Sequence, residues 1–176
     1  MKTILACLFA LLLAGCASSG VEQYRAEKPV LDLKSYLNGT LEAWGIFQGR
    51  DREVQKRFHV VIDAKWEGDT GVLDERFTWS DGTTSRRVWT LTKRADGTWR
   101  GTADDVVGEA LGEVAGNALR WRYVLALPVD GKVYNVDFDD WMFLMDDKVM
   151  LNRSLMSKFG FRLGEVTLSF YKRGGG

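Results

Sequence analysis

Apolar and polar residues alternate most clearly between residues 117 and 172. Four alternating runs lie in this stretch, separated by Asp130-Gly131, Asp146-Asp147 and Phe159-Gly160. Asp-Gly between alternating runs is a strong signal of a short β-hairpin, because a type I′ turn needs positive φ at both central residues. This stretch therefore predicts four consecutive antiparallel strands.

The same pattern continues through the rest of the chain from Thr40 onward, with short joints rich in Gly and Asp between the runs. Sequential antiparallel strands leave two edges exposed, and closure into an up-and-down barrel removes both. The sequence thus predicts an all-β fold, an antiparallel up-and-down barrel of about ten strands. The predicted strands lie at residues 40–48, 54–66, 70–80, 83–94, 98–106, 109–116, 118–127, 132–144, 148–157 and 161–172.

The barrel domain is predicted to span residues 31–173. Its first residues, Leu31 to Leu37, mix apolar and polar positions in a way that favours a single helical turn. We expect this turn to plug one end of the barrel.

Turn positions fix the pairing register, and the register decides which face each side chain occupies. The Asp130-Gly131 turn places Trp121 opposite Asp140. The Asp146-Asp147 turn, taken as a two-residue loop, places Asp140 opposite Arg153. We therefore expect an opposite-charge pair on the apolar inner face of this half of the barrel.

The turns in the first half of the barrel also place charges on the inner face. The Gly68-Asp69 turn places Glu75 on the inner face, and the Asp81-Gly82 turn places Phe77 opposite Arg86. Arg86 then lies diagonally across from Glu75. Two further charges are thus predicted on the inner face.

Charges in a dry core are costly even when they are paired, so these four indicate either partners or water in the interior. Ten strands enclose more volume than the eight that already hold a small ligand. Arg86 or Arg153 would receive the anionic head of an apolar molecule such as a fatty acid or a lysolipid. The alternative is that the charges are structural pairs, or that a bulge turns one of them out to solvent. The predicted ligand-binding residues are Arg86, Arg153, Asp140, Glu75, Trp66, Phe77, Trp79, Trp121, Tyr123 and Phe138.

The N-terminal residues have the features of an exported protein. Lys2 precedes an apolar run at residues 4–13, which is too short to span a bilayer comfortably. The run ends in Leu13-Ala14-Gly15-Cys16, which resembles a bacterial lipobox. The resemblance implies a signal peptide at residues 1–15, a diacylglycerol on Cys16 and a tether at residues 16–30. The alternative is an ordinary signal peptide with a chance cysteine.

Several acyl chains make a stable membrane anchor. Ala17 follows the cysteine where an Asp usually marks retention in the inner membrane, so the pattern favours the outer membrane, facing the periplasm. Cys7 leaves with the signal peptide, and the mature chain then has no disulfide.

Composition excludes several classes of function. Lys plus Arg and Asp plus Glu are equal at 24 each, so no net charge points to nucleic acid. One His and two Cys nearly exclude a metal site built from those ligands, and we expect no cofactor. No catalytic residue is assigned, and the sequence identifies no protein partner.

Five segments resemble the bacterial lipoproteins of domain-of-unknown-function family 3833. They are residues 39–45 (GTLEAWG), 57–58 (RF), 137–144 (DFDDWMFL), 151–160 (LNRSLMSKFG) and 164–168 (GEVTL). The resemblance covers most of residues 30–172. It implies a lipocalin- or calycin-like barrel and brings no activity with it.

Three functional hypotheses follow. The first is an outer-membrane-anchored lipoprotein that binds a lipid-like or amphipathic anionic molecule in its lumen. The second is a non-catalytic interaction protein with a solid barrel, whose contact patch would be Trp89, Trp141 and Phe143. The third is an enzyme acting on envelope lipids, which requires Glu75 or Asp140 to be an acid with a perturbed pKa.

Overall fold

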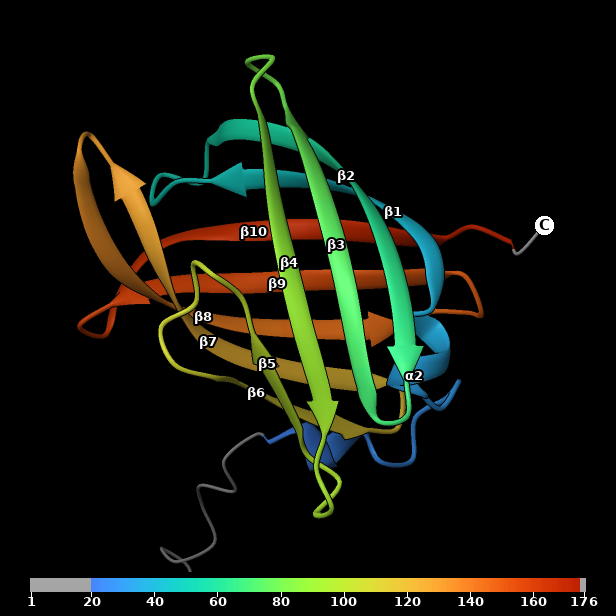
Figure 1. Ribbon diagram of the computed structural model, residues 1–176. Helices are drawn as coiled ribbons and strands as arrows, with labels where there is room; N and C mark the ends of the chain where they lie inside the picture. The colour runs from blue at the N-terminus through green and yellow to red at the C-terminus, as the bar shows by residue number, and fades with distance from the viewer. Residues whose placement is uncertain (1–19, 175–176) are drawn as a thin grey trace, which may run out of the picture.

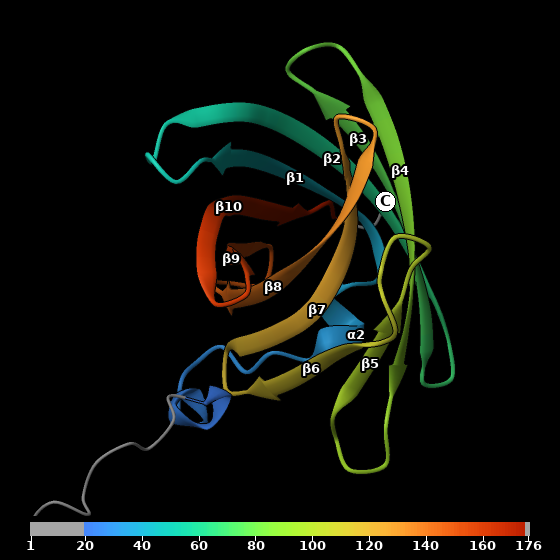
Figure 2. The ribbon, with the colours of Figure 1, turned by 90° about the vertical axis from the view of Figure 1, so that its left-hand side faces the viewer.

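Ten antiparallel strands close into a barrel in the computed structural model, which describes residues 20–174 (Figure 1). Each strand pairs with its sequence neighbours, and β1 pairs with β10, as the alternation predicted. The strands are β1 (Gly39–Gln48), β2 (Val54–Glu67), β3 (Thr70–Trp79), β4 (Thr84–Lys93), β5 (Trp99–Thr102), β6 (Ala110–Ala115), β7 (Ala118–Val129), β8 (Lys132–Leu144), β9 (Val149–Lys158) and β10 (Phe161–Lys172). Figure 2 shows them curving around a common interior.

The predicted signal peptide and Cys16 lie outside the described residues. Within residues 20–174, no helix has the length and hydropathy needed to cross a bilayer. Two short helical segments precede the barrel, η2 (Val21–Tyr24) and α2 (Leu33–Tyr36).

The predicted plug is α2, at the end of the barrel where β2 finishes (Figure 1). Asp32 caps it by accepting a hydrogen bond from the Ser35 N–H at 2.7 Å. Leu33 and Leu37 are buried in the main core of the barrel. We call this the α2 end, and the opposite end, where β1 passes into β2, the far end.

Two of the predicted registers are confirmed. Between β2 and β3, Ile62 lies opposite Glu75. Between β7 and β8, Trp121 lies opposite Asp140 across a two-residue turn in which both Asp130 (φ 49°) and Gly131 (φ 76°) are positive. These pairings place Glu75 and Asp140 on the inner face, as predicted.

The predicted register between β3 and β4 is wrong by one residue. The Trp79 N–H donates to the Thr83 carbonyl, so the loop has three residues and not two. Asp81 accepts the Thr83 N–H at 3.0 Å, and Gly82 takes the positive φ of 81°. Because a one-residue slip reverses the faces of a strand, Arg87 points inward and Arg86 outward.

The predicted register between β8 and β9 is wrong for the same reason. Asp146 accepts the N–H groups of Lys148 and Val149 at 2.8 and 2.7 Å, which lengthens the loop to three residues. Ser154, and not Arg153, therefore lies opposite Asp140. The predicted inner pair of Asp140 with Arg153 does not exist.

A β-bulge in β10 compensates for this slip. The register between β10 and β9 shifts by one residue between Arg162 and Gly164. Val166 and Leu168 consequently face the core, as predicted, although Leu168 lies opposite Asn152 and not Leu151. Because of this bulge, the register error between β8 and β9 reverses the inner and outer residues of β9 but not those of β10.

The strand predicted at residues 98–106 is shorter in the structure, where β5 ends at Thr102. Residues 103–109 form a connection at the far end, held by an isolated bridge between Val106 and Leu125. This connection places Asp105, whose side chain is 39% exposed, within reach of Arg87 at the far end of the barrel.

The predicted contact patch on the outer face is wrong for Trp89, which points into the barrel and is buried. Trp141 and Phe143 lie on the outer face as predicted and are partly exposed. Tyr24 of η2 packs edge-on against both, with ring centroids 5.8 and 5.1 Å apart, and so covers part of their surface.

Truncation of the plug is expected to destabilise the fold. Leu33→Ala removes a buried side chain from the core and is predicted to lower the free energy of unfolding by about 2–5 kcal/mol, measured by urea denaturation. Val30→Ala is the control, because Val30 is 58% exposed and its truncation is expected to cost less than about 0.5 kcal/mol. Equal effects of the two substitutions would show that α2 does not carry core packing.

Candidate functional site

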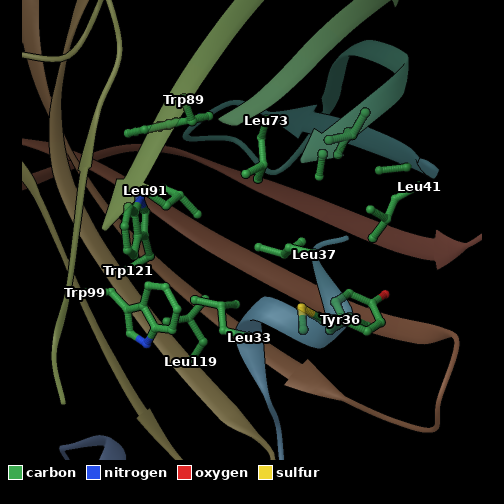
Figure 3. Packing of buried hydrophobic residues seen from close by; sticks show 14 of the residues in the cluster. Leu33, Tyr36, Leu37, Leu41, Leu73, Trp89, Leu91, Trp99, Leu119 and Trp121 are labelled. Atoms are coloured by element: carbon green, nitrogen blue, oxygen red, sulfur yellow. The ribbon is translucent and has the colours of Figure 1, made fainter. Parts of the chain in front are cut away.

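A cavity of about 70 Å³ lies inside the barrel, next to α2. Leu33 of α2 and Leu37, which follows α2, form its floor, and Leu73 and Trp121 lie among the residues of its wall (Figure 3). Small-molecule pockets are typically about 300–1,000 Å³, so only a short apolar group fits without rearrangement of side chains. Among the cavity-lining residues of the described chain, Glu75 alone is ionisable.

Five strands place polar side chains at one level of the interior. Glu75 on β3 lies opposite Arg87 on β4. Asp140 on β8 lies opposite Ser154 on β9 and next to Tyr123 on β7. The cluster is therefore assembled by register, from residues far apart in the sequence.

Asp140 is buried and its hydrogen-bond donors are hydroxyl groups. The Ser154 hydroxyl donates to one carboxylate oxygen, and the Tyr123 hydroxyl donates to the other at 3.4 Å. Burial raises the pKa of Asp140 from its ordinary 3.8 to about 7, against these two hydrogen bonds, which lower it. Burial also raises the pKa of the Tyr123 hydroxyl well above 10.0, so that group keeps its proton.

Glu75 lines the cavity and is partly buried, less completely than Asp140. Burial raises the pKa of Glu75 from 4.5 to about 7. Arg87 acts in the opposite direction, while Asp105 and Asp140 add to the rise, and the Trp89 side chain donates a hydrogen bond that lowers the pKa. Both inner carboxyl groups are thus poised to exchange a proton near neutral pH.

Arg87 is engaged by Asp105. Its Nε lies 3.0 Å from each carboxylate oxygen and its Nη2 lies 2.7 Å from one of them, a bidentate arrangement. The guanidinium also lies over the rings of Phe77 and Trp89, at 5.8 and 5.9 Å from their centroids. The protein therefore engages one edge of the guanidinium, through Nε and Nη2, and places aromatic rings beside it.

The two arginines predicted to receive an anionic head lie on the outer face. Arg86 binds Asp74 through two hydrogen bonds of 2.7 and 3.0 Å. Arg153 is 69% exposed and donates to Glu165 at 2.8 Å. The prediction that Arg86 and Arg153 lie on the inner face was wrong because each placement depended on a loop that has three residues and not two.

The predicted aromatic residues are distributed along the barrel. Trp66 lies at the α2 end, where its indole N–H donates to the Leu37 carbonyl. Trp79 stacks on Phe77 at 5.8 Å and donates to the Ser85 hydroxyl at 2.9 Å. Trp121 lines the cavity. These residues therefore surround the interior at different levels.

Beside the polar cluster, Tyr123 stacks on Phe138 with ring centroids 5.0 Å apart. Sequence reasoning missed Arg87 and Ser154, both of which belong to the cluster, and it named Asp105 only as a possible charge near the end of the inner face. Among residues 20–174, no group of three or more His, Cys, Asp or Glu side chains is arranged to hold a metal ion.

The comparisons with known proteins agree with this architecture. The family model described as "Protein of unknown function (DUF3833)" matches residues 10–172. The chain belongs to the DUF3833 family. No curated protein matches it.

Among solved structures, the DUF3833 barrel resembles the S-type phycobiliprotein lyase CPES from Guillardia theta. The TM-score is 0.60 at 9% sequence identity, over 89% of this chain and 99% of the lyase chain. At that identity the likeness shows the barrel fold. A de novo designed fluorescence-activating β-barrel matches 81% of this chain and 99% of its own at 12% identity and a TM-score of 0.45. A redesigned barrel, mFAP0 bound to DFHBI, matches 78% of this chain and 99% of its own at 14% identity and a TM-score of 0.43.

The raised pKa values predict how stability depends on pH. A carboxyl group whose pKa is higher in the folded state stabilises the fold fully below its unfolded pKa and loses that contribution as pH rises through its folded pKa. For Glu75 this window runs from 4.5 to about 7. Glu75→Gln removes the ionisation. Between pH 5 and pH 8 its free energy of unfolding is therefore expected to rise by about 1–3 kcal/mol relative to that of the wild type.

The measurement is chemical denaturation at a series of pH values, with the difference between variant and wild type plotted against pH. Asp147→Asn is the matched control, because Asp147 is an exposed turn carboxylate. A flat difference curve for Glu75→Gln would show that Glu75 ionises normally in the folded protein.

Proposed function

We propose that this DUF3833 barrel binds a small amphipathic molecule, with its apolar part in the cavity at the α2 end. The observation that carries the proposal is Glu75, an ionisable side chain directed into a cavity that is otherwise almost entirely apolar. Convergence of a few polar groups on an apolar pocket is typical of small-molecule sites. The polar part of the ligand would meet Glu75 and Asp140.

The stability of the fold does not explain these two carboxyl groups. A structural ion pair is present nearby, where Arg87 binds Asp105. Glu75 and Asp140 have no such cationic partner among the described salt bridges. Burial of a carboxyl group without a counter-charge costs stability, so a role in binding is the better account of why both are there.

We also propose that the protein is attached to the outer membrane through Cys16 and faces the periplasm. The lipobox-like Leu13-Ala14-Gly15-Cys16 and the Ala17 that follows it support this placement. Acylation of Cys16 would leave residues 16–30 as a tether between the membrane and the barrel.

Substitution of Cys16 tests the anchor. Cys16→Ser is expected to abolish incorporation of labelled palmitate in bacteria that express the full chain, and to move the protein from the membrane fraction to the soluble fraction. Cys7→Ser is the control and should leave both readouts unchanged, because Cys7 lies within the predicted signal peptide. Labelling that survives in Cys16→Ser would exclude the proposed anchor.

A filled cavity tests the binding function. Leu73→Phe places a larger side chain at the cavity wall and is expected to weaken binding of hexyl-chain amphiphiles at least tenfold, measured by quenching of Trp fluorescence. Val72→Phe is the matched control, since Val72 is the next residue on β3 and is exposed on the outer face. Circular dichroism checks folding, and Leu119→Phe replaces Leu73→Phe if the latter unfolds.

Native mass spectrometry of protein purified without detergent gives an independent readout. A bound small molecule in the wild type and its loss in the cavity-filling variant would support the proposal. An empty wild-type protein whose tryptophans respond equally in Leu73→Phe and Val72→Phe would contradict it.

A second candidate function is general acid–base chemistry on the bound molecule. Two buried carboxyl groups with pKa values of about 7 favour it, because such groups donate and accept protons efficiently at neutral pH. Chemical change of the bound molecule, detected by its mass, separates this candidate from binding alone. Loss of that change in Asp140→Asn, with binding retained, would assign Asp140 to the reaction.

A further inference from the structure

The charges around the cavity are unbalanced. The charged groups that act on Glu75 are Arg87 from β4, Asp105 from the connection after β5 and Asp140 from β8. Three carboxyl groups thus share one guanidinium. The nearest additional charge on β8, Asp139, is on the outer face, where it binds Arg120 at 2.7 Å.

The single guanidinium already carries a carboxylate. Three hydrogen bonds join Nε and Nη2 of Arg87 to Asp105, so this pair is close to neutral as a unit. The hydrogen-bond donors to Glu75 and Asp140 are uncharged groups, the Trp89 indole and the hydroxyls of Ser154 and Tyr123. The cation that acts on both of these carboxyl groups is Arg87, and its charge is shared with Asp105.

Aromatic rings surround the same position. Trp89 is edge-on to Trp121 and to Tyr123, with ring centroids 5.9 and 5.4 Å apart. Tyr123 in turn stacks on Phe138. Aromatic faces attract cations, most strongly where water is excluded, and disfavour anions. Arg87 already lies over the Trp89 ring at 5.9 Å, so this aromatic surface accepts a cation beside the carboxyl groups.

We propose that the polar end of the ligand is an alkylammonium group that lies between Glu75 and Asp140, with its apolar chain directed to Leu33 and Leu37. This inference rests on the proposed binding function and names the ligand class of the same site. The ammonium adds a counter-charge to the one that Arg87 shares with Asp105, and it packs against the aromatic rings. An anionic head would face two carboxyl groups with no cation beyond Arg87 to offset them.

Binding of such a cation is coupled to protons. Below neutral pH Glu75 and Asp140 hold protons, and an ammonium group gains little from them. Binding therefore releases protons near neutral pH, and affinity increases as pH rises. A site that binds only when a group of pKa about 7 is ionised gains about tenfold in affinity between pH 6 and pH 8.

Three probes with one chain length test the sign of the head group. Hexylammonium, hexanoate and hexanol are titrated into the full-length protein at pH 6 and pH 8, with Trp fluorescence and isothermal calorimetry as readouts. Hexylammonium is expected to bind at least tenfold more tightly than hexanoate at pH 8. Calorimetry in buffers of different ionisation enthalpy is expected to show proton release for hexylammonium alone.

Outward-facing neighbours on the same strands provide matched controls. Glu75→Gln and Asp140→Asn are each expected to weaken hexylammonium about tenfold at pH 8 and to leave hexanol unchanged. Asp74→Asn and Asp139→Asn remove carboxylates from the outer face and should leave all three affinities unchanged. Asp105→Asn frees Arg87 and is expected to improve hexanoate binding.

The outcomes separate this inference from the binding function. Tighter binding of hexanoate than of hexylammonium, or equal affinities that do not change with pH, would overturn the ammonium assignment and leave a lumen that binds amphiphiles. No response to any of the three probes, in the wild type and in Leu73→Phe alike, would overturn both. Tighter hexylammonium binding that survives Glu75→Gln and Asp140→Asn together would place the cation elsewhere and also overturn the assignment.

Discussion

The pairing of β1 with β10 is the interaction on which every feature of the interior depends. It runs from Leu41 opposite Lys172 to Gln48 opposite Glu165 and leaves no free edge in the described sheet. Once the sheet is closed, each strand has one enclosed face, and its register decides which side chains enter that enclosure. The chemistry of the lumen is therefore a consequence of loop length as much as of residue type.

The positions of the strands and the closure of the barrel could be predicted from the sequence. Alternation of apolar and polar residues indicates the strands, and short turns between them indicate that sequence neighbours pair. Register could be predicted only where the turn chemistry was read correctly. At Asp130-Gly131 both residues have positive φ, and the loop has two residues. At Asp81-Gly82 and Asp96-Gly97 the Asp accepts the N–H of a following Thr, only the Gly has positive φ, and the loop has three residues. The residue after Asp-Gly thus carries the information that separates the two loops.

This difference decided how much of the site could be predicted. Asp140 and Glu75 were placed inside correctly because both depended on two-residue turns. Arg86 and Arg153 were placed inside wrongly because both depended on three-residue loops. Asp105 could be named only as a possible charge near the end of the inner face, and its pairing with Arg87 could not be predicted, since it lies in a connection whose sequence resembles a strand. Correction of the two slips replaces Arg86 with Arg87, which Asp105 binds, and removes Arg153 from the lumen, so the proposed ligand changes from an anion to a cation.

The shape of the cavity also depends on α2, a segment that other parts of the barrel must hold in place. A four-residue helix such as α2 is not stable alone, so packing and hydrogen bonds from the barrel must place it. Trp66 on β2 donates to the Leu37 carbonyl, and Tyr36 donates to the Lys148 carbonyl at 3.0 Å, so two separate parts of the barrel hold the plug. Because Leu33 and Leu37 form the cavity floor, any displacement of α2 changes the space available to a ligand. The residues that connect the barrel to its proposed anchor are therefore continuous with the floor of its binding site.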